Sequence, residues 1–279
     1  MSHQNKFIPR WHAYFAELLG TFVLVLGGGF SVIQANLKND DFTGVAITHG
    51  LIIAAMVYSF GRFSGGHFNP AVTLGFVIVR DLEWLQGLIY FIFQILGSFL
   101  AGAALLIMIP GHVLKTISTQ SKLGFPALSD DITPLQGMLM EAVATFILVV
   151  VIFATARDKR APDQVFGAMI GATVALDIFA IGPFTGAAMN PARVFGPAVL
   201  TATFQNDWVY WVGPFLGGAL GAVTYWYGFF KGGKGDAKVE EEQKTPLVYR
   251  VSEGSPFADQ PESPSKSNSD YITMENAAN

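Results

Sequence analysis

The tripeptide Asn-Pro-Ala occurs twice in this chain of 279 residues, at 69–71 and at 190–192, and each copy lies in the middle of one apolar half. The amides of Asn69 and Asn190 can both donate and accept hydrogen bonds, and Arg193, directly after the second copy, offers up to five donors. Such groups suit the binding of a small polar molecule. A motif duplicated at matching places in two apolar halves indicates an internally repeated membrane protein whose site lies where the halves meet.

Each half also carries an acid upstream of its Asn-Pro-Ala copy, Glu17 in the first half and Glu141 in the second, and a Thr-Phe pair follows each acid. Ionisable side chains within a membrane span suggest a proton or ion pathway. Their symmetric placement favours a structural role, in which they accept hydrogen bonds from backbone N–H groups of the Asn-Pro-Ala loops. We expect His67 to be hydrogen-bonded within the first loop, with a pH-sensitive gate as the alternative. Asp177 is expected to bond a neighbouring backbone group or to approach His49.

The composition indicates a membrane protein and argues against several other classes. Hydrophobic residues make up 51% of the chain and charged residues 14%, and the mean hydropathy is +0.42. The formal net charge of −4 gives no support for nucleic-acid binding. The chain has no cysteine, which excludes disulfides, thiol catalysis and Cys-ligated zinc. No nucleophile–base pair and no metal-ligating constellation stands out, so we expect no enzyme activity and no metal.

Apolar stretches predict six membrane-spanning helices, each close to the roughly 20 residues that cross the hydrocarbon layer. They lie near 12–34, 43–60, 84–109, 135–156, 165–182 and 208–230. The first stretch is too long for the hydrophobic core of a cleavable signal, so we interpret it as the first span. Two shorter apolar pieces, 69–79 and 190–200, reach only about half of the membrane at about 1.5 Å per residue.

Both short pieces begin with Asn-Pro, which is a helix-start signal, since Asn is a favoured N-cap and Pro fits the next position. Non-helical backbone at the midplane is tolerated only where protein buries it or water reaches it. The sequence therefore predicts an all-α membrane protein with six transmembrane helices and two re-entrant half-helices in an inverted repeat. The repeats span about 12–109 and 135–230 of a channel domain at 12–230. A water-filled path should receive the remaining N–H groups of Asn69 and Asn190.

The distribution of Lys and Arg predicts the orientation of the chain. One side carries Lys6, Arg10, Arg62, Arg80, Arg157, Lys159, Arg160, Lys231, Lys234 and Lys238. The other side carries Lys38, Lys115 and Lys122. We therefore expect both termini in the cytoplasm, in a plasma membrane or a vacuolar or vesicular one. Residues 1–11 form the N-terminus. Residues 231–279 are rich in Ser, Pro and charge and predict a disordered tail, whose Ser-Pro pairs are either phosphorylation sites or part of a solubilising segment.

The motifs resemble those of the aquaporin (major intrinsic protein) family over roughly residues 10–230. The resemblance rests on the paired Asn-Pro-Ala motifs, the approach Ser-Gly-Gly-His at 64–67, the continuation into Arg193, and Trp-Val-Gly-Pro at 211–214. It implies a right-handed six-helix bundle with two re-entrant half-helices and one pore per subunit. It also implies a homotetramer, no cofactor and no chemical reaction.

Matching this family residue by residue places its aromatic/arginine constriction at His49, Ile178, Ala187 and Arg193. This set is similar to that of plant tonoplast-type members, whose constriction is wider than the common water-selective one. In glycerol-conducting members of the family an Asp typically follows the Arg, whereas this chain has Val194 at that position. The resemblance implies a passive channel for water and small neutral solutes, with hydrogen peroxide or ammonia as further candidates, that excludes protons and ions.

Two other classes of function stay open from the sequence alone. A coupled secondary transporter also uses broken helices in inverted repeats. Few ionisable groups besides Arg193 face the expected site, which disfavours cation coupling. A junctional or scaffolding role through the tail and the outer loops is the third class.

Overall fold

The computed structural model describes residues 10–38, 42–116, 123–158, 160–162 and 164–230, and within them the chain forms helices and no strand. The helices are α1 (Trp11–Lys38), α2 (Thr43–Ser64), α3 (Pro70–Ile78), α4 (Trp84–Met108), α5 (Gly111–Thr116), α6 (Pro134–Ile152), α7 (Phe166–Thr185), α8 (Pro191–Thr201) and α9 (Val209–Tyr225). Two π-helical turns, η2 (Phe153–Arg157) and η3 (Trp226–Phe230), continue α6 and α9.

Five of these helical segments are long and apolar enough to cross a membrane: α1, α2, α4, α6 with its π-helical turn, and α7. The sixth expected span begins at Val209, but its α-helical part has only 17 residues before the backbone changes to the five residues of η3. The expected half-helices are present as α3 with nine residues and α8 with 11. The ends of the predicted segments differ from the observed helix ends by up to four residues.

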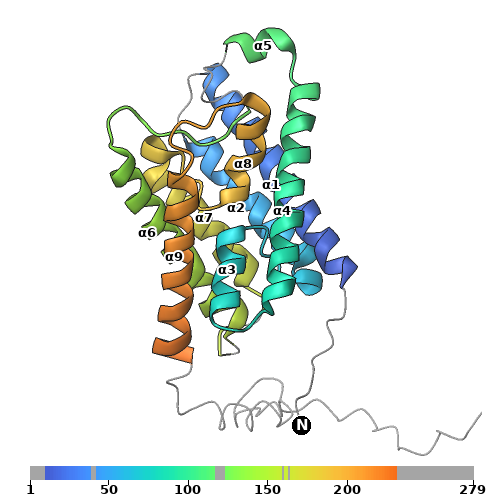
Figure 1. The fold of residues 1–279 in the computed structure, drawn as a ribbon, viewed down its shortest axis with the longest axis vertical. Helices are drawn as coiled ribbons and strands as arrows, with labels where there is room; N and C mark the ends of the chain where they lie inside the picture. The colour runs from blue at the N-terminus through green and yellow to red at the C-terminus, as the bar shows by residue number, and fades with distance from the viewer. Residues whose placement is uncertain (1–9, 39–41, 117–122, 159, 163, 231–279) are drawn as a thin grey trace, which may run out of the picture. The chain divides into compact units, whose positions relative to one another are not determined.

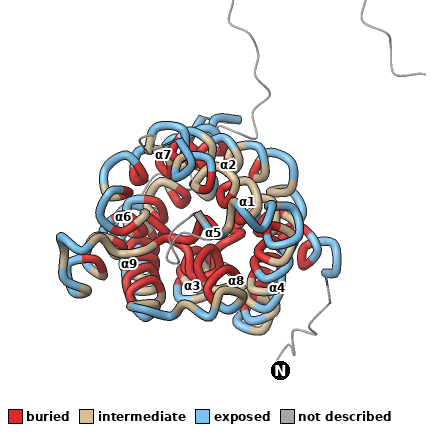
Figure 2. Tube along the Cα trace, turned by 90° about the horizontal axis from the view of Figure 1, so that it is seen from above, coloured by how far each residue is buried: buried red, intermediate tan, exposed pale blue. Residues whose placement is uncertain are grey.

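The long helices form a ring, and α3 and α8 fill one side of it between α4 and α9 (Figure 2). In the first half α1 packs against α4, and in the second half α6 packs against α9 in the same way. Each half-helix packs chiefly against the last long helix of the other half, α3 against α9 and α8 against α4. Figure 1 shows the two half-helices stacked along the bundle axis. The two halves therefore interlock at the level of α3 and α8.

Glycines allow the two equivalent helix pairs to approach closely. A side chain at Gly97 of α4 would overlap the carbonyl oxygen of Leu18 in α1. A side chain at Gly217 of α9 would overlap the carbonyl oxygen of Ala142 in α6. Leu18 and Ala142 each follow one of the two acids, Glu17 and Glu141. Small residues at these crossings bring the acids to the bundle interior.

The turn after α6 is fixed by ion pairs at the end of the bundle where α3 ends. Arg157 donates two hydrogen bonds to Asp81, of 2.5 and 2.7 Å, from Nε and Nη2. Asp158 accepts hydrogen bonds from Arg160 and from the hydroxyl of Tyr225, at 2.8 Å for the latter. The Arg160 guanidinium lowers the pKa of Asp158 to about 2, against the opposing effect of burial.

The sequence analysis did not anticipate α5 or the two π-helical turns. The short helix α5 follows a proline, Pro110, and is too short for its periodicity to stand out. The expected tail at 231–279 lies outside the described residues, as do residues 1–9 of the N-terminus.

Candidate functional site

Two helix starts meet inside the bundle, and each begins at an asparagine. The Oδ1 atom of Asn69 accepts a hydrogen bond from the N–H of Ala71 at 2.8 Å, and Asn190 accepts one from Ala192 at 3.0 Å. In both cases the asparagine is the N-cap and a proline follows at the first helical position. The local sequence thus explains why α3 and α8 start where they do.

The side-chain amide of each asparagine donates a hydrogen bond to the backbone of the opposite loop. Asn69 donates from Nδ2 to the carbonyl oxygen of Met189 at 2.7 Å, and Asn190 donates to the carbonyl oxygen of Phe68 at 2.9 Å. Phe68 and Met189 have φ values of 48° and 51°, a left-handed conformation that is unusual for residues other than glycine. One N–H of each amide is therefore used to join the two loops. One N–H of each amide remains.

The two acids hold the loops that precede the asparagines. Glu17 accepts hydrogen bonds from the backbone N–H groups of His67 and Phe68, at 3.0 and 2.6 Å. Glu141 accepts them from Ala188 and Met189, at 2.8 and 2.7 Å. Both carboxylates are completely buried. This geometry supports the structural role over the transport role, because the loop backbone binds both oxygen atoms of each carboxylate.

A chain of side-chain hydrogen bonds is specific to the first half. Gln94 of α4 donates from Nε2 to Glu17 at 2.8 Å and to the hydroxyl oxygen of Thr73 at 2.9 Å. The same hydroxyl lies 3.1 Å from Nδ1 of His67. All four side chains are buried. In the second half Thr185 donates its hydroxyl proton to Glu141 at 2.7 Å instead.

Arg193 lies in the first turn of α8 and is 5% exposed. Its Nη1 atom donates to the carbonyl oxygens of Ala187 and of Gly186, at 3.3 Å for the latter. The αL backbone of Ala187, with a φ of 45°, presents that carbonyl to the guanidinium. Arg193 is thus fixed by its own loop, and its remaining donors are available to a solute.

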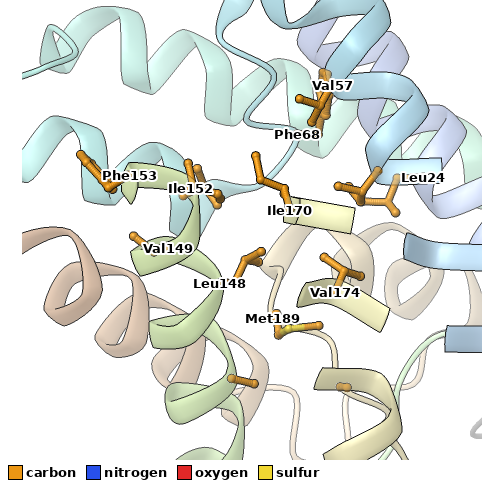
Figure 3. Packing of buried hydrophobic residues seen from close by; sticks show 14 of the residues in the cluster. Leu24, Val57, Phe68, Leu148, Val149, Ile152, Phe153, Ile170, Val174 and Met189 are labelled. Atoms are coloured by element: carbon orange, nitrogen blue, oxygen red, sulfur yellow. The ribbon is translucent and has the colours of Figure 1, made fainter. Parts of the chain in front are cut away.

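A cavity lies inside the bundle beside the two loops. Its polar lining consists of His49, His67, Asn69, Asn190 and Arg193. Its apolar lining consists of Leu24, Ile53, Val57, Val72, Leu148, Ile152, Ile170, Val174, Ala188 and Met189. Figure 3 shows several of these apolar side chains gathered from different helices around the loop residue Met189. Four of these polar side chains come from the two loops and the starts of the half-helices, whereas His49 comes from α2. The aliphatic side chains come mainly from the long helices.

Arg193 also lines a second hollow, together with Val45 of α2, Gly186 and residues 124–129 of the loop before α6. The two hollows share Arg193 in their linings. The Arg193 side chain therefore borders both hollows.

The four expected constriction residues occupy different positions. His49 and Arg193 line the inner cavity. Ile178 and Ala187 are completely buried in the adjoining hydrophobic cluster, and neither belongs to the cavity lining. Their assignment to the constriction stays a prediction.

The ring of His49 donates from Nδ1 to the carbonyl oxygen of Val45 at 2.9 Å, so in its neutral form Nε2 is an acceptor. The ring packs over Gly28 of α1, where a Cβ would overlap it. Asp177 is also buried, and within the described part of the chain its Oδ2 atom has no hydrogen-bond partner. No hydrogen bond between Asp177 and His49 is present among the described residues.

Sequence reasoning missed Gln94 and Ser98, both completely buried in α4. Ser98 donates to the carbonyl oxygen of Ala192 and accepts from the N–H of Gly196 at 3.1 Å, which ties α8 to α4. The signal that could have found them is the presence of two polar side chains, four residues apart, in a helix that is otherwise almost entirely apolar.

Across the described residues there is no group of three or more His, Asp or Glu side chains that could hold a metal ion. The site instead offers fixed hydrogen-bond donors in an apolar passage between two half-helices. This combination defines a helical membrane channel.

Comparison with known proteins agrees with this class. The model of the family "Major intrinsic protein" matches residues 3–225. "Aquaporin NIP1-1" of Oryza sativa subsp. japonica is 40% identical over 220 residues, which cover 78% of this chain and 74% of the relative. "Probable aquaporin TIP2-1" of the same organism is 39% identical over 222 residues, which cover 76% and 86%. The chain belongs to the major intrinsic protein (aquaporin) family, whose members are channels for water or small solutes and not enzymes.

A solved structure also shares the fold. The X-ray structure of the aquaglyceroporin from Plasmodium falciparum superposes with a TM-score of 0.70 over 78% of this chain and 96% of that chain. Because its sequence is only 23% identical, this likeness concerns the fold alone.

Proposed function

We propose that this chain is a passive water channel that also admits hydrogen peroxide or ammonia and excludes protons and ions. The proposed pore residues are Asn69, Asn190, Arg193, His49, Ile178 and Ala187. Glu17, Glu141 and His67 support the re-entrant loops. Two similar relatives carry the printed names of different aquaporin types, so overall similarity does not choose between filter types.

The observation that carries this proposal is the arrangement of donors at the meeting point of the loops. Each asparagine keeps one N–H after the crossing bond, and each stands at a helix N-terminus with about half a positive charge. A water molecule there must accept from both sides, which orients it against relaying a proton. The same positive potential repels hydronium.

The side chains at Arg193 favour small solutes that can both donate and accept hydrogen bonds. Arg193 supplies donors, and neutral His49 has an acceptor at Nε2 once Nδ1 has donated to Val45. Water, ammonia and hydrogen peroxide each combine donors with acceptors. The apolar cavity wall gives glycerol few partners for its three hydroxyl groups, and Val194 is buried behind the loop.

Stopped-flow light scattering on proteoliposomes tests the function directly. Vesicles with the full chain should shrink faster than empty vesicles after an osmotic step in sucrose, and an imposed pH gradient should persist. Parallel measurements with peroxide, ammonia and glycerol define the solute range. Solute flux that stops when ion gradients are collapsed would indicate a coupled transporter instead.

His49→Phe tests the assignment of the constriction. The larger ring should reduce peroxide permeation more than water permeation. Ile47, an exposed residue on the same helix, provides the matched control, since Ile47→Phe should change neither. An unchanged ratio of peroxide to water permeability in well-folded His49→Phe protein would place the constriction elsewhere.

The proposal extends to assembly and location. We propose a homotetramer with one pore per subunit, in a plasma, vacuolar or vesicular membrane, with both termini and the tail at 231–279 in the cytoplasm. The cation distribution of the sequence supports this orientation.

A further inference from the structure

His67 lines the cavity on the side of the first half-helix, and its imidazole is held from several sides. The ring lies 4.5 Å from the ring of Phe76 and makes an edge contact at 5.4 Å with Tyr90, measured between centroids. Its Nδ1 atom lies 3.1 Å from the hydroxyl oxygen of Thr73. A flipped ring would place carbon against that hydroxyl and lose the hydrogen bond.

The direction of the hydrogen bond between Thr73 and His67 follows from the groups behind it. Glu17 accepts from two backbone N–H groups, and Gln94 turns its NH₂ group toward the carboxylate. In this orientation the Oε1 atom of Gln94 has no hydrogen-bond partner among the described residues. The other hydrogen of that NH₂ group is donated to the hydroxyl oxygen of Thr73. The hydroxyl oxygen of Thr73 therefore accepts a hydrogen bond from Gln94, as Glu17 does.

The hydroxyl proton of Thr73 then needs an acceptor. Among the described residues its oxygen contacts only Gln94 and Nδ1 of His67, and the NH₂ group of Gln94 can only donate. The proton of Thr73 therefore points at Nδ1, which must be unprotonated. In a neutral ring the proton is on Nε2, and no described residue bonds that atom.

We propose that Gln94 and Thr73 are positioning residues that fix His67 as its Nε2–H tautomer. His67 then presents a donor, and no proton acceptor, to the cavity beside Asn69. Protonation at Nδ1 would make both His67 and Thr73 donors in the same contact, so it is disfavoured. A passing water must accept from His67, which extends the row of donors formed by the two asparagines and leaves no basic site for hydronium.

Charged and titratable groups around His67 come from four places. Glu17 of α1 binds the backbone N–H of His67, and the phenol of Tyr90 of α4 lies at the ring edge. Asp81, after α3, is paired with Arg157. Arg193 lines the same cavity. The inference rests on the proposed function only where it concerns conduction; the tautomer itself does not depend on it.

The test is ¹⁵N nuclear magnetic resonance of the full chain in lipid bilayers with labelled histidine, where His67→Asn assigns the signal. The wild type should show a protonated Nε2 and an unprotonated Nδ1 that stay unchanged between about pH 8 and pH 5, where histidine normally titrates. A protonated Nδ1 in the wild type, as the other tautomer or as imidazolium, would overturn the proposal.

Thr73→Val should free Nδ1, so that the signal becomes a mixture of tautomers and titrates. Thr73→Ser should restore the wild-type signal. The matched control is Thr173→Val, because among the described residues the hydroxyl of Thr173 bonds only to Met169 of its own helix. If Thr73→Val keeps the wild-type tautomer and does not titrate, the hydroxyl does not fix the ring.

Water permeability of the same samples separates the two proposals. It should be independent of pH in the wild type and in Thr73→Ser, and in Thr73→Val it should vary by about twofold or more across the range in which the ring titrates. A pH-independent Thr73→Val permeability with a titrating ring would show that the tautomer does not act on conduction. A wild type with the expected tautomer and no water flow would refute the proposed function and leave the tautomer assignment intact.

Discussion

Replacing Glu141 by Gln should destabilise the protein strongly although the two side chains have the same shape. The carboxylate accepts from Ala188, Met189 and the hydroxyl of Thr185. A glutamine keeps one acceptor oxygen and turns an NH₂ group toward at least one backbone N–H. Hydrogen bonds to a charged group contribute about 1.5 to 3 kcal/mol each, and an unsatisfied buried donor costs a similar amount. We expect a loss of about 3 to 5 kcal/mol in the free energy of unfolding.

Equilibrium unfolding in mixed detergent micelles measures this loss. Stopped-flow shrinkage of proteoliposomes should also show reduced water flow, because Asn190 and Arg193 should shift together with the loop that Glu141 no longer holds. Glu17→Gln should behave alike, since Glu17 also holds two backbone N–H groups. The matched control is Glu83→Gln, an exposed glutamate that makes no capping hydrogen bond. A Glu141→Gln protein within about 1 kcal/mol of the wild type would refute the hydrogen-bond argument. Normal stability combined with loss of a proton-dependent flux would instead favour an ion pathway.

Three further changes test other parts of the structure. Arg193→Val should keep or raise water flow and admit a proton or cation leak, measured with a pH-sensitive dye in vesicles; an unchanged leak and solute range would remove Arg193 from the constriction. Gly217→Ala should lower stability by about 1 to 3 kcal/mol, because the new methyl group meets the backbone carbonyl of Ala142, whereas Gly44→Ala, with open space around it, should not. Arg160→Gln should raise the pKa of Asp158 from about 2 toward its usual value of about 3.9, so the stability advantage of the wild type should be complete above pH 4 and fade as the pH falls toward 2. Thermal unfolding at a series of pH values checks this, and a difference that does not depend on pH would mean that the ion pair does not set the titration.

The half-helices could be predicted from the sequence because Asn-Pro is a local signal: capping and the fixed φ of proline act within one turn. The hydrogen bonds of Glu17 and Glu141 to the loop backbone could be predicted from the duplication of these acids, since two equivalent acids indicate equivalent contacts. Both inferences need only short-range chemistry or symmetry.

Other features depend on how distant segments meet. The hydrogen bonds between each asparagine amide and the opposite loop require a positive φ at Phe68 and Met189, which directs their carbonyl groups toward the amides. No local sequence pattern predicts a positive φ at a residue other than glycine. The partners of Gln94 come from α1 and α3, 77 and 21 residues away in the sequence. Whether Ile178 and Ala187 reach the cavity depends on rotations of α7 and the second loop that hydrophobic periodicity does not fix.

The exchange of partners between the two halves has a consequence for synthesis and membrane insertion. The half-helix α3 is made early, yet it packs chiefly against α9, the last of the described long helices in the chain to be made. Until then Asn69 lacks the carbonyl of Met189, and Phe68 lacks the amide of Asn190. An N-terminal fragment would leave these polar groups unpaired at the midplane, where each costs several kcal/mol. We therefore expect α3 and the loop before it to take their final position only after translation of the second half is complete.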